Sequence, residues 1–183
     1  MRTHVALLRG INVGGSGKVP MAELRRLLGE EFDDVATYIA SGNVVLSTDR
    51  DDGTVATTVA EVLRTGFAVP RPVVVLGRDE YAAAVDANPF PQVTEPKELH
   101  AVFRAAPPGD DERARIDAAV AAERAKGGAG EAAVVGRVVY LHLPGGIGRS
   151  ELGARLSART RAADEGGTAR NWATVLKLRD LLG

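Results

Sequence analysis

With 183 residues, of which 45% are hydrophobic and 26% charged, the chain has the composition of a folded globular protein and is long enough for one large or two small domains. Its net charge of −1 gives no electrostatic signature for duplex nucleic acid or an acidic membrane. The absence of cysteine excludes disulfides, thiol catalysis and thiolate metal sites, and it suits a reducing compartment.

The apolar run near the N-terminus is short. Val5 to Leu8 gives about four apolar residues, whereas the core of a signal peptide needs about 7–15. No segment of the sequence approaches the roughly 18 apolar residues that a membrane-spanning helix requires. We therefore expect a cytoplasmic protein with no membrane partner.

The first part of the chain predicts strands at residues 4–11, 35–40, 44–47 and 73–76, with helices that begin at Pro20 and Asp51. This βαββαβ order over residues 1–78 is typical of a ferredoxin-like domain. Right-handed crossovers make the first two strands parallel, with the third strand antiparallel between them. We therefore expect the loop over residues 10–18 and the turn over residues 41–43 to meet at the same end of the sheet.

The second part, residues 79–183, begins with a helix at 79–86 and a proline-rich connection. It continues with a strand at 99–105, a helix that runs to about 126 with Asp110 as its N-cap, a hairpin of 132–135 and 138–143, and a helix after Ser150. A polar loop over 163–170 precedes a last helix at 171–182. The predicted fold class is α+β, with a ferredoxin-like first subdomain and a related βαββα second subdomain that ends in helices.

The strongest candidate site is the glycine-rich segment NVGGSGKV, which links the first strand to the first helix. It is not a nucleotide-hydrolysing phosphate loop, because Asn12 replaces the first glycine and Val19 replaces the hydroxyl residue. Val19 would be the helix N-cap and has no side-chain acceptor, so the N–H groups of Met21 and Ala22 are left for water or a ligand. Lys18 adds a positive charge. The alternative is a loop whose glycines serve only its turns.

Two other polar segments have both a structural and a functional interpretation. Ser41 and Asn43 flank a glycine in a good hairpin turn, and they become site candidates through the expected meeting with the loop. In the segment PGGIGRS, Arg149 could clamp a carboxylate or phosphate, whereas Ser150 is a natural helix N-cap.

The last helix has the spacing of an amphipathic helix. Its positions place Arg170, Thr174 and Lys177 on one face, and Asn171 is a natural N-cap. The histidines His4, His100 and His142 all lie in predicted strands without the paired spacing of metal ligands, so we assign no metal and no cofactor.

Several longer motifs are similar to one known family: ALLRGINVGG and KVPMAELRRLL, then TYIASGNVV, NPF, VYLHLPGGIGRS and TARNWATVLKL. On these motifs the chain resembles the bacterial domain-of-unknown-function 1697 family. The resemblance implies two α+β subdomains, the first ferredoxin-like, and no established activity. The sequence departs from the family pattern at Ala40 and Ala173, where relatives often carry amides.

The leading functional hypothesis is binding of a small anionic ligand, for which phosphate-bearing molecules are candidates. The candidate ligand-binding residues are Arg9, Asn12, Gly14, Gly15, Lys18, Ser41, Asn43, Arg149, Ser150, Arg170, Asn171 and Lys177. One alternative is a regulatory or protein-interaction module without catalysis. RNA binding is a weaker alternative, because the first and third strands carry no aromatic residue to stack on bases. The sequence identifies no catalytic residue, no specific ligand and no oligomeric state.

Overall fold

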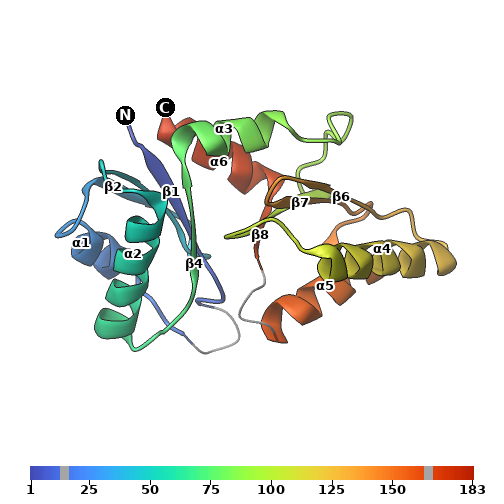
Figure 1. Ribbon diagram of the computed structural model, residues 1–183, viewed down its shortest axis with the longest axis horizontal. Helices are drawn as coiled ribbons and strands as arrows, with labels where there is room; N and C mark the ends of the chain where they lie inside the picture. The colour runs from blue at the N-terminus through green and yellow to red at the C-terminus, as the bar shows by residue number, and fades with distance from the viewer. Residues whose placement is uncertain (13–16, 163–166) are drawn as a thin grey trace. The chain divides into compact units, whose positions relative to one another are not determined.

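The chain divides into two units in its structure, a computed structural model that describes residues 1–12, 17–162 and 167–183, without the side chains of 157–162 (Figure 1). The first unit consists of Met1–Ala83 and Lys177–Gly183. The second unit is Ala84–Leu176. The segment 177–183 therefore belongs with the first unit, although it follows the second unit in the sequence.

The first unit has the predicted βαββαβ order. Its elements are β1 (His4–Leu8), α1 (Met21–Leu28), β2 (Asp33–Tyr38), β3 (Asn43–Ser47), α2 (Asp52–Phe67) and β4 (Val73–Gly77). The sheet order is β2-β3-β1-β4, and each neighbouring pair is antiparallel. Both β1 and β2 therefore run opposite to β3 and parallel to each other, so the predicted ferredoxin-like topology is confirmed.

Both helices of this unit pack on one face of the sheet (Figure 1). Leu24 and Leu28 of α1 are fully buried, and the (i, i+4) spacing between them places them on one side of the helix. From α2, the side chains of Val55, Val59 and Leu63 are fully buried in the same core. The Asp51 carboxylate caps α2 by accepting from the Thr54 N–H at 3.0 Å.

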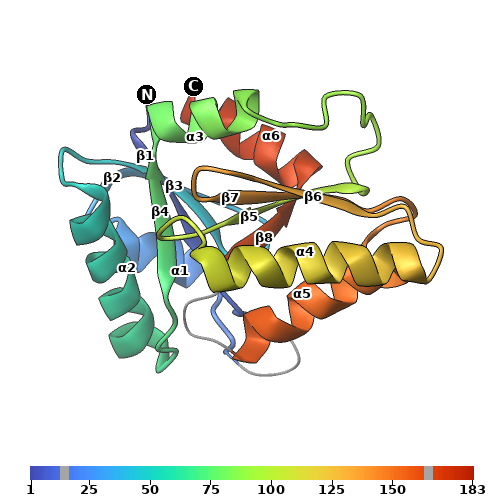
Figure 2. The same ribbon diagram turned by 45° about the vertical axis from the view of Figure 1, so that its right-hand side comes forward.

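The second unit repeats this topology. Its strands are β5 (Leu99–Phe103), β6 (Glu131–Val135), β7 (Val138–His142) and β8 (Thr168–Asn171). Its helices include α4 (Asp110–Ala125), the 3-10 helix η1 (Ile147–Arg149) and α5 (Glu151–Ala162), and α4 and α5 lie side by side on one face of the sheet (Figure 2). The order β6-β7-β5-β8 is antiparallel throughout. Two further helices, α3 (Arg78–Asp86) and α6 (Trp172–Leu182), carry the chain from one unit to the other.

The strand β8 corrects the sequence prediction, which placed a polar loop over residues 163–170. Thr168 and Arg170 are 4% and 7% exposed, whereas Ala169 and Asn171 are exposed. Both buried positions of this strand are thus polar, whereas the buried positions of a strand are usually apolar. The second unit is therefore a complete βαββαβ unit, and α6 follows its fourth strand.

Two helix starts also differ from the prediction. Gly109, not Asp110, is the N-cap of α4. The last helix starts at Trp172, and Asn171 caps it by accepting the Thr174 N–H at 2.9 Å. The predicted capping roles of Asn171 and Ser150 are confirmed, since the Ser150 hydroxyl accepts the Gly153 N–H at 3.0 Å at the start of α5.

Candidate functional site

The end of β1 and the turn between β2 and β3 lie together, as the topology predicts. The Leu8 N–H donates to the Gly42 carbonyl at 2.8 Å. Gly42 has a φ of +82°, and a Cβ there would lie 2.7 Å from Leu8 Cβ and 2.8 Å from Ile11 Cδ1. Only glycine suits this backbone conformation and this close approach. We call the described residues at this end of the first unit, 9–12, 17–23 and 39–43, the loop edge.

Asn12 closes the glycine-rich loop with its side chain. Its Oδ1 accepts the Val19 N–H at 2.8 Å, and its Nδ2 donates to the Val19 carbonyl at 3.0 Å and to the Ala40 carbonyl at 2.8 Å. The Asn12 N–H also donates to the Gly17 carbonyl at 3.0 Å. Asn12 adopts a φ of 54°, a left-handed conformation that asparagine tolerates better than most residues. The side chain thus joins both ends of the loop to the neighbouring turn, and we call this arrangement the Asn12 clasp.

The first turn of α1 presents backbone N–H groups. The N-cap is Pro20 and not Val19, and no described side chain caps the helix. Val19 is buried, and its N–H is taken by the Asn12 clasp. Within the described residues, Met21, Ala22 and Glu23 have no partner for their N–H groups, as the geometry of a helix start dictates.

Two charged side chains lie at the start of α1: the Lys18 ammonium and the Glu23 carboxylate, which is paired with an arginine. Lys18 is exposed and directly precedes the buried Val19. The Glu23 carboxylate accepts from the Arg26 guanidinium one turn further along the helix, at 2.8–3.2 Å. This hydrogen bonding holds the pKa of Glu23 below its ordinary value. The loop edge therefore combines helix N–H donors with a lysine that has no acidic neighbour among the described ion pairs.

The turn residues have different environments. Asn43 is fully buried, and its Nδ2 donates to the Tyr38 carbonyl at 3.0 Å and to Ser41 Oγ at 3.1 Å. Its amide therefore holds the turn together, whereas Ser41 is exposed. Ile39, in the same turn, is 50% exposed and has a φ of 51°, an uncommon conformation for a β-branched residue.

The other predicted site residues are distributed over both units. Gly14 and Gly15 lie outside the described residues. Arg9 is half-buried and follows β1 directly, and Lys177 is exposed on α6, in the part of that helix that belongs to the first unit. The remaining candidates, Arg149, Ser150, Arg170 and Asn171, belong to the second unit.

Arg170 does not have the environment of a ligand clamp. It lies in β8, and its Nη1 donates to Thr168 Oγ1 at 2.6 Å and to the Ala169 carbonyl at 2.8 Å. Thr174 is buried, whereas Lys177 is exposed, so the predicted polar face shared by Arg170, Thr174 and Lys177 is wrong. The reason is that the chain is a strand, and not a helix, up to Asn171. Arg149, at the end of η1, is exposed.

The equivalent end of the second unit has the opposite chemistry. There the Arg137 guanidinium donates to the Arg104 carbonyl at 3.2 Å, joining the β6–β7 turn to the end of β5. The helix that follows, α4, also lacks a side-chain cap, but its first turn contains Asp110, Asp111 and Glu112. Glu112 is paired with Arg104 at 2.5 Å, and the other two carboxylates at this helix N-terminus disfavour an anion. Of the two fold-equivalent ends, only the loop edge is suited to a negatively charged ligand.

A groove of about 500 Å³ lies between α1 and α2, apart from the loop edge. Its lining includes Thr57, Thr58 and Thr65, whose hydroxyls each donate to the carbonyl four residues earlier in α2. It also includes three glutamates that form ion pairs with arginines, namely Glu30, Glu31 and Glu61. The groove thus presents acceptors, which is unsuitable chemistry for an anion.

Two features are absent from the described residues. In the part of the chain that the structure describes, no group of three or more His, Asp or Glu side chains is arranged to hold a metal ion. Within the same residues, no helix has the length and apolarity needed to span a bilayer.

Comparisons with known proteins agree with this fold. The chain resembles the solved structure of the conserved bacterial protein SP0830 from Streptococcus pneumoniae, with a TM-score of 0.74, 19% identity, and coverage of 100% of this chain and 99% of that one. At this identity the likeness concerns the fold alone. No curated protein matches the sequence.

One family matches the sequence, under the description "Protein of unknown function (DUF1697)". The match covers residues 1–140, which include the glycine-rich loop, the Ser41–Asn43 turn and β5 through most of β7. The second-half motifs TARNWATVLKL and most of VYLHLPGGIGRS lie beyond the matched span. Because the matched residues make up well over half of the chain, the protein belongs to the DUF1697 family.

Proposed function

We propose that the first unit binds a small anionic ligand, of the phosphate-bearing class, at the loop edge. The observation that carries the proposal is the uncapped first turn of α1, which directly follows Lys18 and the Asn12 clasp. Helix N–H groups together with a nearby ammonium favour negative charge, and a phosphate oxygen accepts from both. The clasp fixes Val19, and thereby the chain between Lys18 and the helix.

The second unit supports the proposal as an internal comparison. The same topology there leads to a helix whose first turn is acidic, so the fold does not by itself produce an anion-binding end. Asn43 and Arg170 act within the protein in this proposal, because both are buried and hydrogen-bonded internally. Ser41 and Lys18 are the exposed side chains that contact the ligand.

Calorimetric titration with inorganic phosphate and pyrophosphate tests this function. Replacing Lys18 with alanine is expected to weaken binding about fivefold, the effect of one partly exposed charge near a helix terminus. Pyrophosphate is expected to bind more tightly than phosphate, and raising the ionic strength should weaken both.

The matched control is Lys97→Ala, which removes an exposed lysine of the second unit. This variant should bind both anions like the original protein. If neither anion binds, or if Lys18→Ala and Lys97→Ala bind equally well, the loop edge is not an anion site.

A further inference from the structure

The two sheets carry a histidine at equivalent positions of the fold. His4 in β1 pairs with Leu46 of β3, and His100 in β5 pairs with Leu141 of β7. In both units the partner is the penultimate residue of the third strand, and each histidine also pairs with the last residue of the fourth strand. Both histidines are 8% exposed. The repeated topology thus places two imidazoles in corresponding buried positions.

Both imidazoles lie on the helix-covered face of their sheet. Alternate residues of a strand share a face, so His100 lies on the side of Val102, which packs in the core with Leu152 of α5. His4 contacts α2 directly, through Asp52. In each unit, therefore, the histidine lies on the sheet face that the second helix covers.

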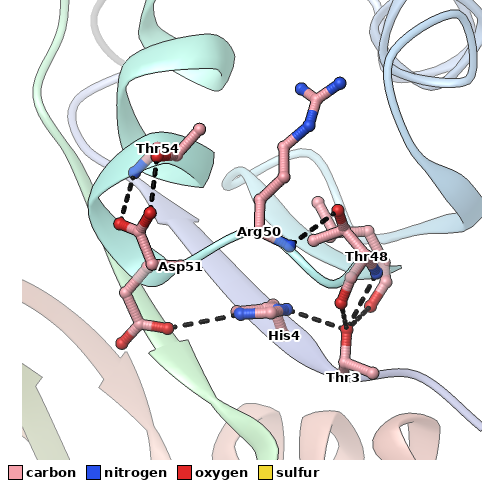
Figure 3. A network of polar contacts seen from close by, with 8 residues as sticks. Thr3, His4, Thr48, Arg50, Asp51 and Thr54 are labelled. Atoms are coloured by element: carbon pink, nitrogen blue, oxygen red, sulfur yellow. Dashed lines mark hydrogen bonds and ion pairs between the residues drawn. The ribbon is translucent and has the colours of Figure 1, made fainter.

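His4 has a partner for each ring nitrogen (Figure 3). Its Nε2 lies 3.4 Å from Oδ1 of Asp52, the first residue of α2, and its Nδ1 lies 2.8 Å from Thr3 Oγ1. The Thr3 hydroxyl donates to the Thr48 carbonyl at 3.0 Å and accepts the Thr48 N–H at 3.0 Å. Each ring nitrogen of His4 thus has an oxygen within reach.

His100 lacks such a partner at one ring nitrogen, Nδ1. No described group lies within hydrogen-bond distance of its buried Nδ1. The residue that corresponds to Asp52, as the first residue of the second helix, is Glu151 of α5. The Glu151 carboxylate instead accepts from Lys126 at 2.8 Å and from Arg155 at 2.7 Å. The Glu151 carboxylate is thus paired with these two cations and not with His100.

Other acceptors at this end of the second unit are also engaged. Glu123, near the end of α4, accepts from the Leu152 N–H at 2.8 Å and from the Ser150 hydroxyl at 3.2 Å. Glu98, two residues before His100, accepts the Gly145 N–H at 2.9 Å. The oxygen of Asn171 in β8 serves as the N-cap of α6, and the remaining strand neighbour, Leu141, is apolar. A proton on Nδ1 of His100 would therefore lie in a buried position where the structure describes no acceptor for it.

We propose that the second unit is the acid-sensitive half of the protein, in which proton uptake by His100 drives local opening while the first unit remains folded. In the folded chain, burial holds the pKa of the His100 imidazole below its ordinary value of 6.5. As the pH falls from above 6.5 towards the lowered pKa of the folded state, the open form binds a proton that the closed form does not. The second unit therefore has its full stability above pH 6.5. It loses stability as the pH falls from 6.5 to the lowered pKa of folded His100. Opening of the second unit should then rise by at most about tenfold per pH unit, the limit for one proton.

Hydrogen exchange of the full chain between pH 7.5 and 5, converted to protection factors, measures the opening of each unit separately. We expect peptides from β5, β7 and β8 to lose protection as the pH falls, by up to about tenfold per unit, while β1, β3 and β4 keep theirs. Simultaneous loss of protection in both units would overturn the proposal.

The deciding variant is His100→Leu, which fills the buried position with an apolar side chain and removes the titrating group. We expect its second unit to show no acid response. The fold-equivalent change His4→Leu should weaken the first unit but leave the acid response of the second. A persistent response in His100→Leu overturns the inference. If this variant does not fold, the imidazole titration of His100 in the unmodified protein decides by NMR, and titration at the ordinary value would contradict the proposal.

Discussion

Replacement of Gly42 by alanine is expected to destabilise the first unit by about 3 kcal/mol, since the new methyl group meets a packed core in an unfavourable backbone conformation. The added Cβ would lie 2.7 Å from Leu8 Cβ and 2.8 Å from Ile11 Cδ1, and the φ of +82° strains any residue with a side chain. Leu8 and Ile11 are both buried, so they have little room to move away. Urea unfolding followed by far-UV circular dichroism measures the loss, and hydrogen exchange assigns it to the first unit.

The matched control is Gly136→Ala in the equivalent hairpin of the second unit. Gly136 also has a positive φ, of 55°, but a Cβ there would have no atom within 4 Å. This variant should lose only about 1 kcal/mol, from the backbone conformation alone. Equal losses for the two variants would show that the close packing between the β2–β3 turn and β1 contributes nothing to stability.

A comparable loss is expected when the buried carboxylate of Glu123 is removed. Glu123 is 6% exposed and accepts from the Gly130 N–H at 3.3 Å, the Leu152 N–H at 2.8 Å and the Ser150 hydroxyl at 3.2 Å. Glu123→Ala leaves these donors buried without an acceptor and opens a cavity, so the second unit should lose about 3–4 kcal/mol. The fluorescence of Trp172, which lies in the second unit and is the only tryptophan, reports this unfolding.

The surface carboxylate Glu131 provides the control. Glu131→Ala removes a half-exposed group at the edge of the same sheet, whose side-chain contact is with His142. Its midpoint of urea unfolding should stay close to that of the original protein. If Glu123→Ala unfolds at the same urea concentration as Glu131→Ala, then the carboxylate is not what joins α4 to α5.

The sequence predicts an element of this fold where the apolar residues of that element are also its buried residues. In α2 the buried residues Val55, Val59 and Leu63 recur at helical spacing, so both the helix and its buried side can be predicted. In β8 the buried residues are Thr168 and Arg170, so the segment has the polar pattern of a loop. The Arg170 guanidinium donates to Thr168 and Ala169 of the same strand, and these local hydrogen bonds leave no signal in an apolar pattern.

The candidate site was predictable only in outline. The meeting of the glycine loop with the β2–β3 turn follows from strand direction, which the element order determines. The Asn12 clasp does not follow, because it requires a left-handed Asn12 and a bond to Ala40, 28 residues away. The structural role of Glu123 could have been suspected from the sequence. A glutamate close to a helix C-terminus is unfavourable to the helix dipole, so its presence suggests that the carboxylate binds donors outside the helix.

The return of residues 177–183 to the first unit affects how the protein is made. Arg2 donates to the Leu181 carbonyl at 2.8 Å and to the Asp34 carbonyl at 2.9 Å, so the N-terminal strand is joined to a helix end that the ribosome delivers much later. During translation the first unit remains incomplete until the whole of the second unit has been synthesised, a delay on the order of ten seconds. A nascent chain halted after residue 83 would present that sheet without its final segment.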